Sequence, residues 1–192
     1  MNIKLIPTNE VKKTGSLIIP IFEDIPISKL PEKILDTTVK NYINKTIKQN
    51  KDCTSIGKIN ILPVTNHKNY NQILILGLGN TNKLSINEFR INLAESIRRV
   101  KRSNTKSLYL LSYKQLYKNF PIIDFGQVIS ESTTLGLYQF NKYKTKSTKI
   151  SIQYFYIIEE NKKNYDEINQ GISNGEIISN SVNLCRDLVN EP

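Results

Sequence analysis

Six segments of the chain carry the apolar and β-branched residues that are typical of β-strands. They are Ile3–Ile6, Leu17–Phe22, Lys58–Val64, Gln72–Leu76, Ser107–Tyr113 and Ile150–Ile158. A polar turn separates the first two, so we expect them to form an opening hairpin or an edge of the sheet. The run Ile73–Leu76 has no polar alternation, as is typical of a strand covered on both faces, and we expect it to be the central strand. The preceding strand should pair with it across a short loop.

Four further segments repeat apolar residues at intervals of three and four, which predicts helices with one buried face. They are Pro31–Asn50, Ser85–Val100, Ile122–Phe140 and Asp166–Val189. Ser85 with Glu88 three residues later forms a capping-box pattern at the start of the second helix. Strands that alternate with helices predict an α/β three-layer sandwich with a mixed, largely parallel sheet. The last helix leads out of this sandwich like a connector.

Composition limits the class of protein. The chain has 192 residues, 39% of them hydrophobic and 23% charged, which is typical of one folded globular unit. No run approaches the roughly 18 apolar residues of a membrane span, and the first ten residues lack a signal-peptide core. Cys53 and Cys185 are too isolated for a disulfide framework. We therefore expect a cytoplasmic protein without a membrane partner.

The net charge of +10 raises the question of nucleic-acid binding. Lysines are scattered along the chain, and basic residues gather only at Arg98–Arg102 and Lys142–Lys149. Phosphate contacts need clustered charge, and cations late in a helix also complement its dipole. Nucleic-acid binding is therefore the less favoured interpretation of the charge.

A glycine turn, Gly77-Leu78-Gly79, follows the Ile73–Leu76 strand and precedes the Ser85 helix. Strand, glycine turn and helix is the order found in many phosphate-binding sites. The third glycine of a dinucleotide fingerprint is missing, since Asn82 and Lys83 occupy its place, and no Gly-Lys-Ser/Thr sequence follows. The pattern favours a plain strand-to-helix turn over a working phosphate site.

Residues with catalytic or metal-binding chemistry are sparse. The single histidine, His67, lies in an Asn-rich loop and is expected to be a solvated loop residue. The acidic pairs Glu159-Glu160 and Asp166-Glu167 are explained by a strand end and a helix N-terminus, and no spacing supports a metal site. The residues alone therefore predict an α/β domain without an identifiable active site.

Two stretches carry a more specific signal. Ile129–Lys146 contains a helix end of the form Gly-x-Tyr-x-Phe followed by a Lys-rich turn, and Gly175–Pro192 ends in Arg186-Asp187-Leu188-Val189-Asn190-Glu191-Pro192. The first resembles a segment of the leucine (cytosol) aminopeptidase family, and the second is similar to the end of that family's inter-domain helix. Ile73–Gly79 also falls where the amino-terminal domain of that family has a strand and turn. The specific signal is concentrated in the last dozen residues.

The resemblance implies that residues 1–163 form a macro-domain-like α/β amino-terminal domain, and residues 164–192 a connector helix and the start of a catalytic domain. It implies a peptidase whose two divalent metal ions, zinc or manganese, lie in that catalytic domain. The family motif Asn-Thr-Asp-Ala-Glu-Gly-Arg does not occur in this chain. No catalytic, cofactor-binding or metal residue is therefore assigned here, and the chain alone is expected to be inactive.

The implied partners are the catalytic domain and the sister subunits of a homo-hexamer, in which this domain has an architectural or regulatory role. A connector helix without its catalytic domain should leave part of its apolar stripe exposed, at Ile172, Ile178, Val182 and Cys185. The alternative hypothesis is a stand-alone macro-like module that binds an ADP-ribose-type ligand at Gly77-Leu78-Gly79, or nucleic acid.

Overall fold

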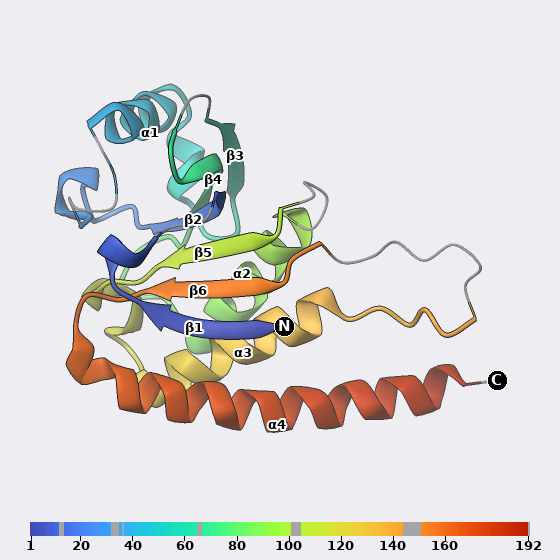
Figure 1. The fold of residues 1–192 in the computed structure, drawn as a ribbon. Coiled ribbons are helices and arrows are strands. Elements are labelled where there is room, and N and C mark those ends of the chain that lie inside the picture. The colour runs from blue at the N-terminus through green and yellow to red at the C-terminus, as the bar shows by residue number, and fades with distance from the viewer. Residues whose placement is uncertain are drawn as a thin grey trace.

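A computed structural model of the chain describes residues 1–11, 14–31, 35, 37–64, 67–100, 105–143 and 151–191 (Figure 1). Its strands are β1 (Asn2–Ile6), β2 (Gly15–Ile21), β3 (Ile59–Pro63), β4 (Tyr70–Gly77), β5 (Ser107–Leu111) and β6 (Tyr154–Ile158). Its α-helices are α1 (Thr37–Gln49), α2 (Ile86–Val100), α3 (Ile122–Leu137) and α4 (Tyr165–Asn190). Each expected strand and helix is present. The mixed α/β architecture predicted from the alternating pattern is confirmed.

The six strands form one sheet in the order β1-β6-β5-β2-β4-β3. All neighbours are parallel except β3 and β4, which form the expected antiparallel pair with Ile61 opposite Leu74. Of the two alternatives for the first two strands, the hairpin is wrong and the edge is right for β1 alone. β1 is an edge strand beside β6, and β2 lies between β5 and β4. Two strands, β6 and β5, lie between β1 and β2 in the sheet. Because β1 and β2 run in the same direction, a tight turn cannot join them.

The expectation that Ile73–Leu76 is the central strand is also wrong. β4 lies second from the edge, and β2 occupies a more central place. All seven residues of β2 are buried, including the polar Ser16. The aliphatic run of β4 is fully buried because both of its faces are covered, and this coverage does not require a central position.

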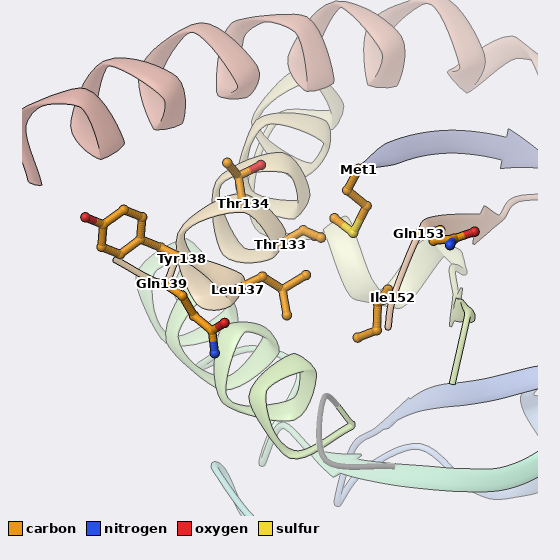
Figure 2. Close-up of a pocket in the computed structure, with 8 residues that line it drawn as sticks. All are labelled: Met1, Thr133, Thr134, Leu137, Tyr138, Gln139, Ile152 and Gln153. Atoms are coloured by element: carbon orange, nitrogen blue, oxygen red, sulfur yellow. The ribbon is translucent and has the colours of Figure 1, made fainter. Parts of the chain in front are cut away.

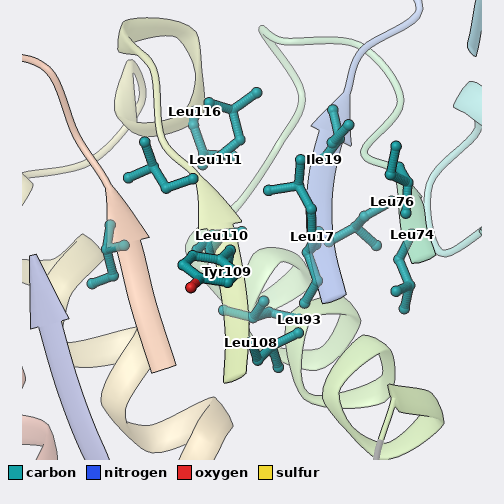
Figure 3. Packing of buried hydrophobic residues seen from close by; sticks show 14 of the residues in the cluster. Leu17, Ile19, Leu74, Leu76, Leu93, Leu108, Tyr109, Leu110, Leu111 and Leu116 are labelled. Atoms are coloured by element: carbon teal, nitrogen blue, oxygen red, sulfur yellow. The ribbon is translucent and has the colours of Figure 1, made fainter. Parts of the chain in front are cut away.

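The core follows the inner strands. Leu17 of β2, Leu108 and Leu110 of β5 and Leu93 of α2 belong to one buried cluster (Figure 3). Burial of an aliphatic side chain of this kind contributes about 1.5–3 kcal/mol, so these residues contribute substantially to the stability of the sheet. Figure 1 shows α2 behind β5 and β6 and α3 behind β1, on the same side of the sheet.

Short sequence patterns explain two of the helices: a capping box for α2 and an apolar repeat for α1. The Ser85 amide donates to Glu88 Oε2 (2.9 Å) and the Glu88 amide donates to Ser85 Oγ (3.2 Å), so the predicted capping box is confirmed. In α1, Val39 and Ile43 are buried as the repeat predicts, whereas Tyr42 is 40% exposed. Ile34, another position of that repeat, lies outside the described residues.

The long helix α4 packs on α3 along its first half. Gly126 of α3 faces the Ile168 backbone, and Gly171 and Gly175 of α4 face the backbone of residues 123 and 127. Without side chains at these positions, the two helix backbones come into direct contact. The second half of α4 extends past this contact toward the C-terminal end of the chain (Figure 1). No helix in the described ranges has the length and apolar character needed to cross a membrane.

Candidate functional site

The backbone amides of the glycine turn after β4 donate hydrogen bonds to carbonyl groups of other segments. The Gly77 amide donates to Lys58 O (2.8 Å), the Leu78 amide to Ile21 O (2.9 Å) and the Gly79 amide to Thr54 O (2.9 Å). Gly79 has a φ of 66°, the left-handed conformation that glycine adopts without strain. A phosphate-binding loop needs unpaired amides that point at the ligand. These three amides are paired, which agrees with the prediction of a plain strand-to-helix turn.

The neighbours of the turn add to this conclusion. Gly77 lies against the backbone of the short helix η3 (Lys51–Thr54), so that a side chain there would meet Cys53 O at 2.6 Å. The Thr81 amide, two residues after Gly79, donates to Asp24 Oδ1 at 2.9 Å. This amide is therefore already used by a carboxylate of the chain itself.

Asp24 gives the turn a measurable pH dependence. Partial desolvation raises the pKa of Asp24, but hydrogen bonds from the Thr81 hydroxyl and amide outweigh it, and the pKa is lowered overall. A lowered folded-state pKa stabilises the fold above the ordinary Asp pKa of about 4, and this stability is lost as the pH falls through the folded value. We expect the urea midpoint of Asp24→Asn to fall less than that of the wild type between pH 5 and 3. Parallel curves would contradict this assignment.

The structure places the remaining predicted residues in structural roles. His67 is half-buried rather than solvated, since its Nδ1 accepts from the Asn69 and Tyr70 amides (3.1 and 3.2 Å) and its ring stacks on Tyr70. Glu159 directly follows β6, and Asp166 and Glu167 lie in the first turn of α4, as expected. In the part of the chain that the structure describes, no three His, Cys, Asp or Glu side chains form a group that could hold a metal ion. These residues do not fit a resident metal, and no chemical step is assigned through one.

The basic cluster is partly neutralised where it is described. Arg98 and Arg99 both pair with the single carboxylate of Glu95, at 3.0 and 3.3 Å, so these three side chains keep one net positive charge. Arg102 and the lysines from 144 to 149 lie outside the described residues. The described part of this cluster therefore offers little free charge for a nucleic-acid backbone.

The two stretches that carry the family resemblance touch each other. The Tyr138 hydroxyl donates to Asp187 Oδ1 (2.7 Å), and the Arg186 guanidinium lies 5.3 Å from the centre of the Tyr138 ring. Lys142 and Tyr143 both bind the carboxylate of Glu191, and their hydrogen bonds lower the pKa of that residue. The segment after α3 thus fixes the last turn of α4. The sequence indicated both stretches but not their contact.

An apolar groove runs along the end of α4. Its cavity measures about 400 Å³ and is lined by Val182, Cys185 and Val189, with Ser181, Arg186 and Asn190. The predicted exposure of the connector helix is confirmed at Ile178 and Cys185, while Val182 is half-buried and Ile172 is buried on α3. Three further side chains, Ile177, Leu184 and Leu188, are at least 60% exposed on the other side of the helix. The sequence analysis did not single these out.

A second cavity of about 540 Å³ lies between the start of β1, the end of α3 and the residues before β6 (Figure 2). Met1, Leu137 and Ile152 are among its apolar walls, and Thr133, Thr134, Gln139 and Gln153 are polar. The Thr133 hydroxyl is already used, since it donates to Ile129 O at 2.5 Å. Tyr138 also lines it, and none of its described lining residues is an Asp, Glu, Lys, Arg, His or Cys.

Comparison with known proteins agrees with these features. Residues 18–147 match the model of the cytosol aminopeptidase family, N-terminal domain. A probable cytosol aminopeptidase of Alkaliphilus metalliredigens is 27% identical over 179 residues, which are 92% of this chain and 36% of that protein. One from Buchnera aphidicola is 30% identical over 199 residues, 97% of this chain and 38% of that protein. The chain thus spans little more than a third of the length of these curated relatives.

Solved structures share the fold. A mutant tomato leucine aminopeptidase superposes with a TM-score of 0.74 at 18% identity, over 100% of this chain and 38% of that one. The bottromycin maturation enzyme BotP, also solved in complex with Mn, gives 0.66 at 16% identity, over 93% of this chain and 33% of that one. The matched family model covers most of the chain, from β2 to beyond α3. The chain therefore belongs to the cytosol aminopeptidase family, to whose N-terminal domain it corresponds.

Proposed function

We propose that this chain is the non-catalytic N-terminal part of a leucyl-aminopeptidase-like metallopeptidase that removes N-terminal amino acids from peptides. Residues 1–163 form its α/β domain, and residues 164–192 form the connector to a catalytic domain. The observation that carries the proposal is the apolar groove at the end of α4, which has the composition of a surface that packs against another domain. Family membership and the length of the relatives support the same assignment.

The contact between Tyr138 and Asp187 holds the end of α4 in a fixed position relative to the α/β domain. Lys142 and Tyr143 hold Glu191, so the direction in which the chain leaves α4 is set by the α/β domain. A fixed exit orients whatever follows α4 with respect to the sheet. We propose that this orientation serves the assembly of a homo-hexamer in the cytosol, with two divalent metal ions held by the catalytic domain.

The first test is enzymatic. The purified 192-residue chain, with manganese and a leucyl-anilide substrate, should release no leucine above the buffer blank, because its described residues offer no group for a metal-activated water. The full-length relative from Alkaliphilus metalliredigens is the positive control. Leucine release by the chain alone would refute the non-catalytic assignment.

The second test concerns the groove. The gene sequence downstream of Pro192 is read first: an in-frame continuation with a Lys, three Asp and a Glu at metal-cluster spacing would support the proposal and supply a longer product, and a stop codon there would contradict it. In that longer product, Val189→Asp should lower the thermal midpoint, because it places a charge at a dry contact. In the 192-residue chain it should have no effect, since Val189 is 84% exposed. Asn180→Asp, also exposed on α4, is the matched control.

The two alternative functions receive no support from the geometry. Binding of an ADP-ribose-type ligand at the glycine turn would need amides that are already paired. Titration with ADP-ribose should therefore produce no heat. Retention on duplex DNA should likewise be absent, because Arg98 and Arg99 are paired with Glu95.

A further inference from the structure

A third pocket, of about 490 Å³, lies at the carboxyl ends of β5 and β6, far from the groove on α4. Figure 1 shows the arrowheads of these parallel strands ending at the same side of the sheet. Ser112, Tyr113 and Lys114 follow β5, and Glu159 follows β6. In open α/β sheets, ligands bind outside the carboxyl ends of the strands. The position is therefore the one where this architecture places small molecules.

The floor of the pocket holds a buried negative charge. Glu159 is only 3% exposed. Its carboxylate accepts hydrogen bonds from the Ser112 hydroxyl (2.7 Å) and the Asn161 amide (2.8 Å), and the Tyr117 hydroxyl lies 3.5 Å away. Among the described residues, no lysine, arginine or histidine forms an ion pair with it, whereas the other buried acid, Glu131, pairs with Arg90 at 2.8 Å.

An unpaired buried charge is costly, and buried charges are normally matched by a cation. The hydrogen bonds to Glu159 come from two neutral hydroxyls and a neutral amide, so no described donor balances the negative charge. Oε2 accepts from Ser112 and Tyr117, whereas Oε1 accepts from the Asn161 amide and can accept a further bond. The pocket thus presents an anion with free acceptor capacity and 490 Å³ of space in front of it.

Two tyrosines form an aromatic wall. The Tyr113 hydroxyl donates to Pro20 O at 2.6 Å, and the Tyr117 hydroxyl accepts from Asn164 Nδ2 at 3.0 Å, which fixes both rings. Burial and the Glu159 carboxylate raise the pKa of Tyr117 to about 12, so it is neutral at physiological pH. An aromatic wall beside a carboxylate suits an organic ammonium group, through cation–π attraction. It does not suit a divalent metal, which needs several oxygen ligands.

The rim carries one charge of each sign. Lys114 lines the pocket and is exposed to solvent, and Glu160, which also lines it, accepts from the Thr8 amide at 2.9 Å. We propose that this pocket binds a small molecule through a primary ammonium group that pairs with Glu159, and that a free α-amino acid, with its carboxylate toward Lys114, is the ligand. The proposal is independent of the function proposed for α4, because no residue of the groove lines this pocket.

Three related probes test which group is recognised. L-Leucine carries both charges, 3-methylbutylamine lacks the carboxylate and 4-methylpentanoate lacks the ammonium. In calorimetric titrations of the purified chain up to about 10 mM, where a millimolar site is largely filled, leucine and the amine should bind saturably and the acid should not. Tighter binding of leucine than of the amine identifies an amino-acid site, and equal binding identifies an alkylamine site. Failure of both ammonium probes, or binding of the acid alone, would overturn the proposal.

Variants then locate the charge. Glu159→Gln keeps the shape of the side chain and should weaken both ammonium probes at least tenfold, whereas Glu176→Gln, an exposed residue of α4, should change neither. Lys114→Ala should weaken leucine but not the amine. Unchanged binding by a folded Glu159→Gln chain would overturn the proposal. If Glu159→Gln does not fold, the Lys114→Ala variant is the decisive test. Unchanged leucine binding by Lys114→Ala would exclude the proposed orientation of the ligand.

Discussion

Replacing Gly171 by alanine should destabilise the chain by about 3 kcal/mol, the upper end of the usual cost of overpacking. A Cβ atom at this position would overlap the carbonyl oxygen of Ile123 and lie 2.8 Å from the Gln127 amide nitrogen. Both are backbone atoms of α3 and cannot rotate away. The helices would have to separate, and the buried contacts of Ile168 and Ile172 would be lost with them.

The matched control is Gly136→Ala, a glycine near the end of α3. Its Cβ would lie 3.3 Å from Ala94 O, a tight contact but one that a small shift relieves. Alanine also improves helix propensity by up to about 1 kcal/mol, so this variant should stay within roughly 1 kcal/mol of the wild type. Urea unfolding followed by far-UV circular dichroism measures both. Equal losses for the two variants would mean that the α3–α4 contact is not backbone-limited.

The Gly171→Ala variant also tests whether the position of α4 on α3 sets the direction in which the chain leaves α4. Tyr138 and Asp187 meet only if α4 keeps its position along α3. A displaced α4 would break this bond even where the chain remains folded. Hydrogen exchange in the last turn of α4 should therefore increase in Gly171→Ala and remain unchanged in Gly136→Ala.

The parts of the fold that could be predicted are those fixed by neighbouring residues. The Ser85/Glu88 cap and the pairing of β3 with β4 depend on short spacings, and both are as expected. The place of β1 is different, because five residues of alternating burial fit an edge beside β6 as well as one beside β2. The place of β1 depends on pairs such as Asn2 opposite Tyr154, far apart along the chain, which a single sequence does not display.

The candidate sites also contain features set by neighbouring residues, which could be predicted, and features set by distant residues, which could not. The apolar stripe of α4 follows from its periodicity, and its exposed end was expected. The burial of Glu159 was not, because it depends on Tyr117 and Asn164, which reach the strand end from two other segments. An acidic residue after a strand normally indicates a solvated end. Only the structure shows that this one is enclosed, and that no cation among the described residues forms an ion pair with it.

Replacing Gly77 by alanine should also cost about 3 kcal/mol, whereas Gly79→Ala should cost about 1–2 kcal/mol. A side chain at Gly77 would overlap Ser55 O and lie 2.6 Å from Cys53 O and 2.9 Å from Thr54 C, all backbone atoms around η3. At Gly79 the nearest atom, Ile56 Cβ, is 3.5 Å away, so the cost there comes from the φ of 66° alone.

These two substitutions also separate the structural role of the glycines from a ligand-binding one. A phosphate-binding turn is kept open for its ligand, so alanine there would abolish binding of ADP-ribose and leave the free energy of unfolding of the free chain nearly unchanged. If the turn instead packs against η3, both substitutions lower the free energy of unfolding, and Gly77→Ala lowers it by more than Gly79→Ala. Urea midpoints for the two variants, with an ADP-ribose titration of the wild type, distinguish the two roles. Stable variants together with ADP-ribose binding by the wild type would restore the glycine turn as a ligand site.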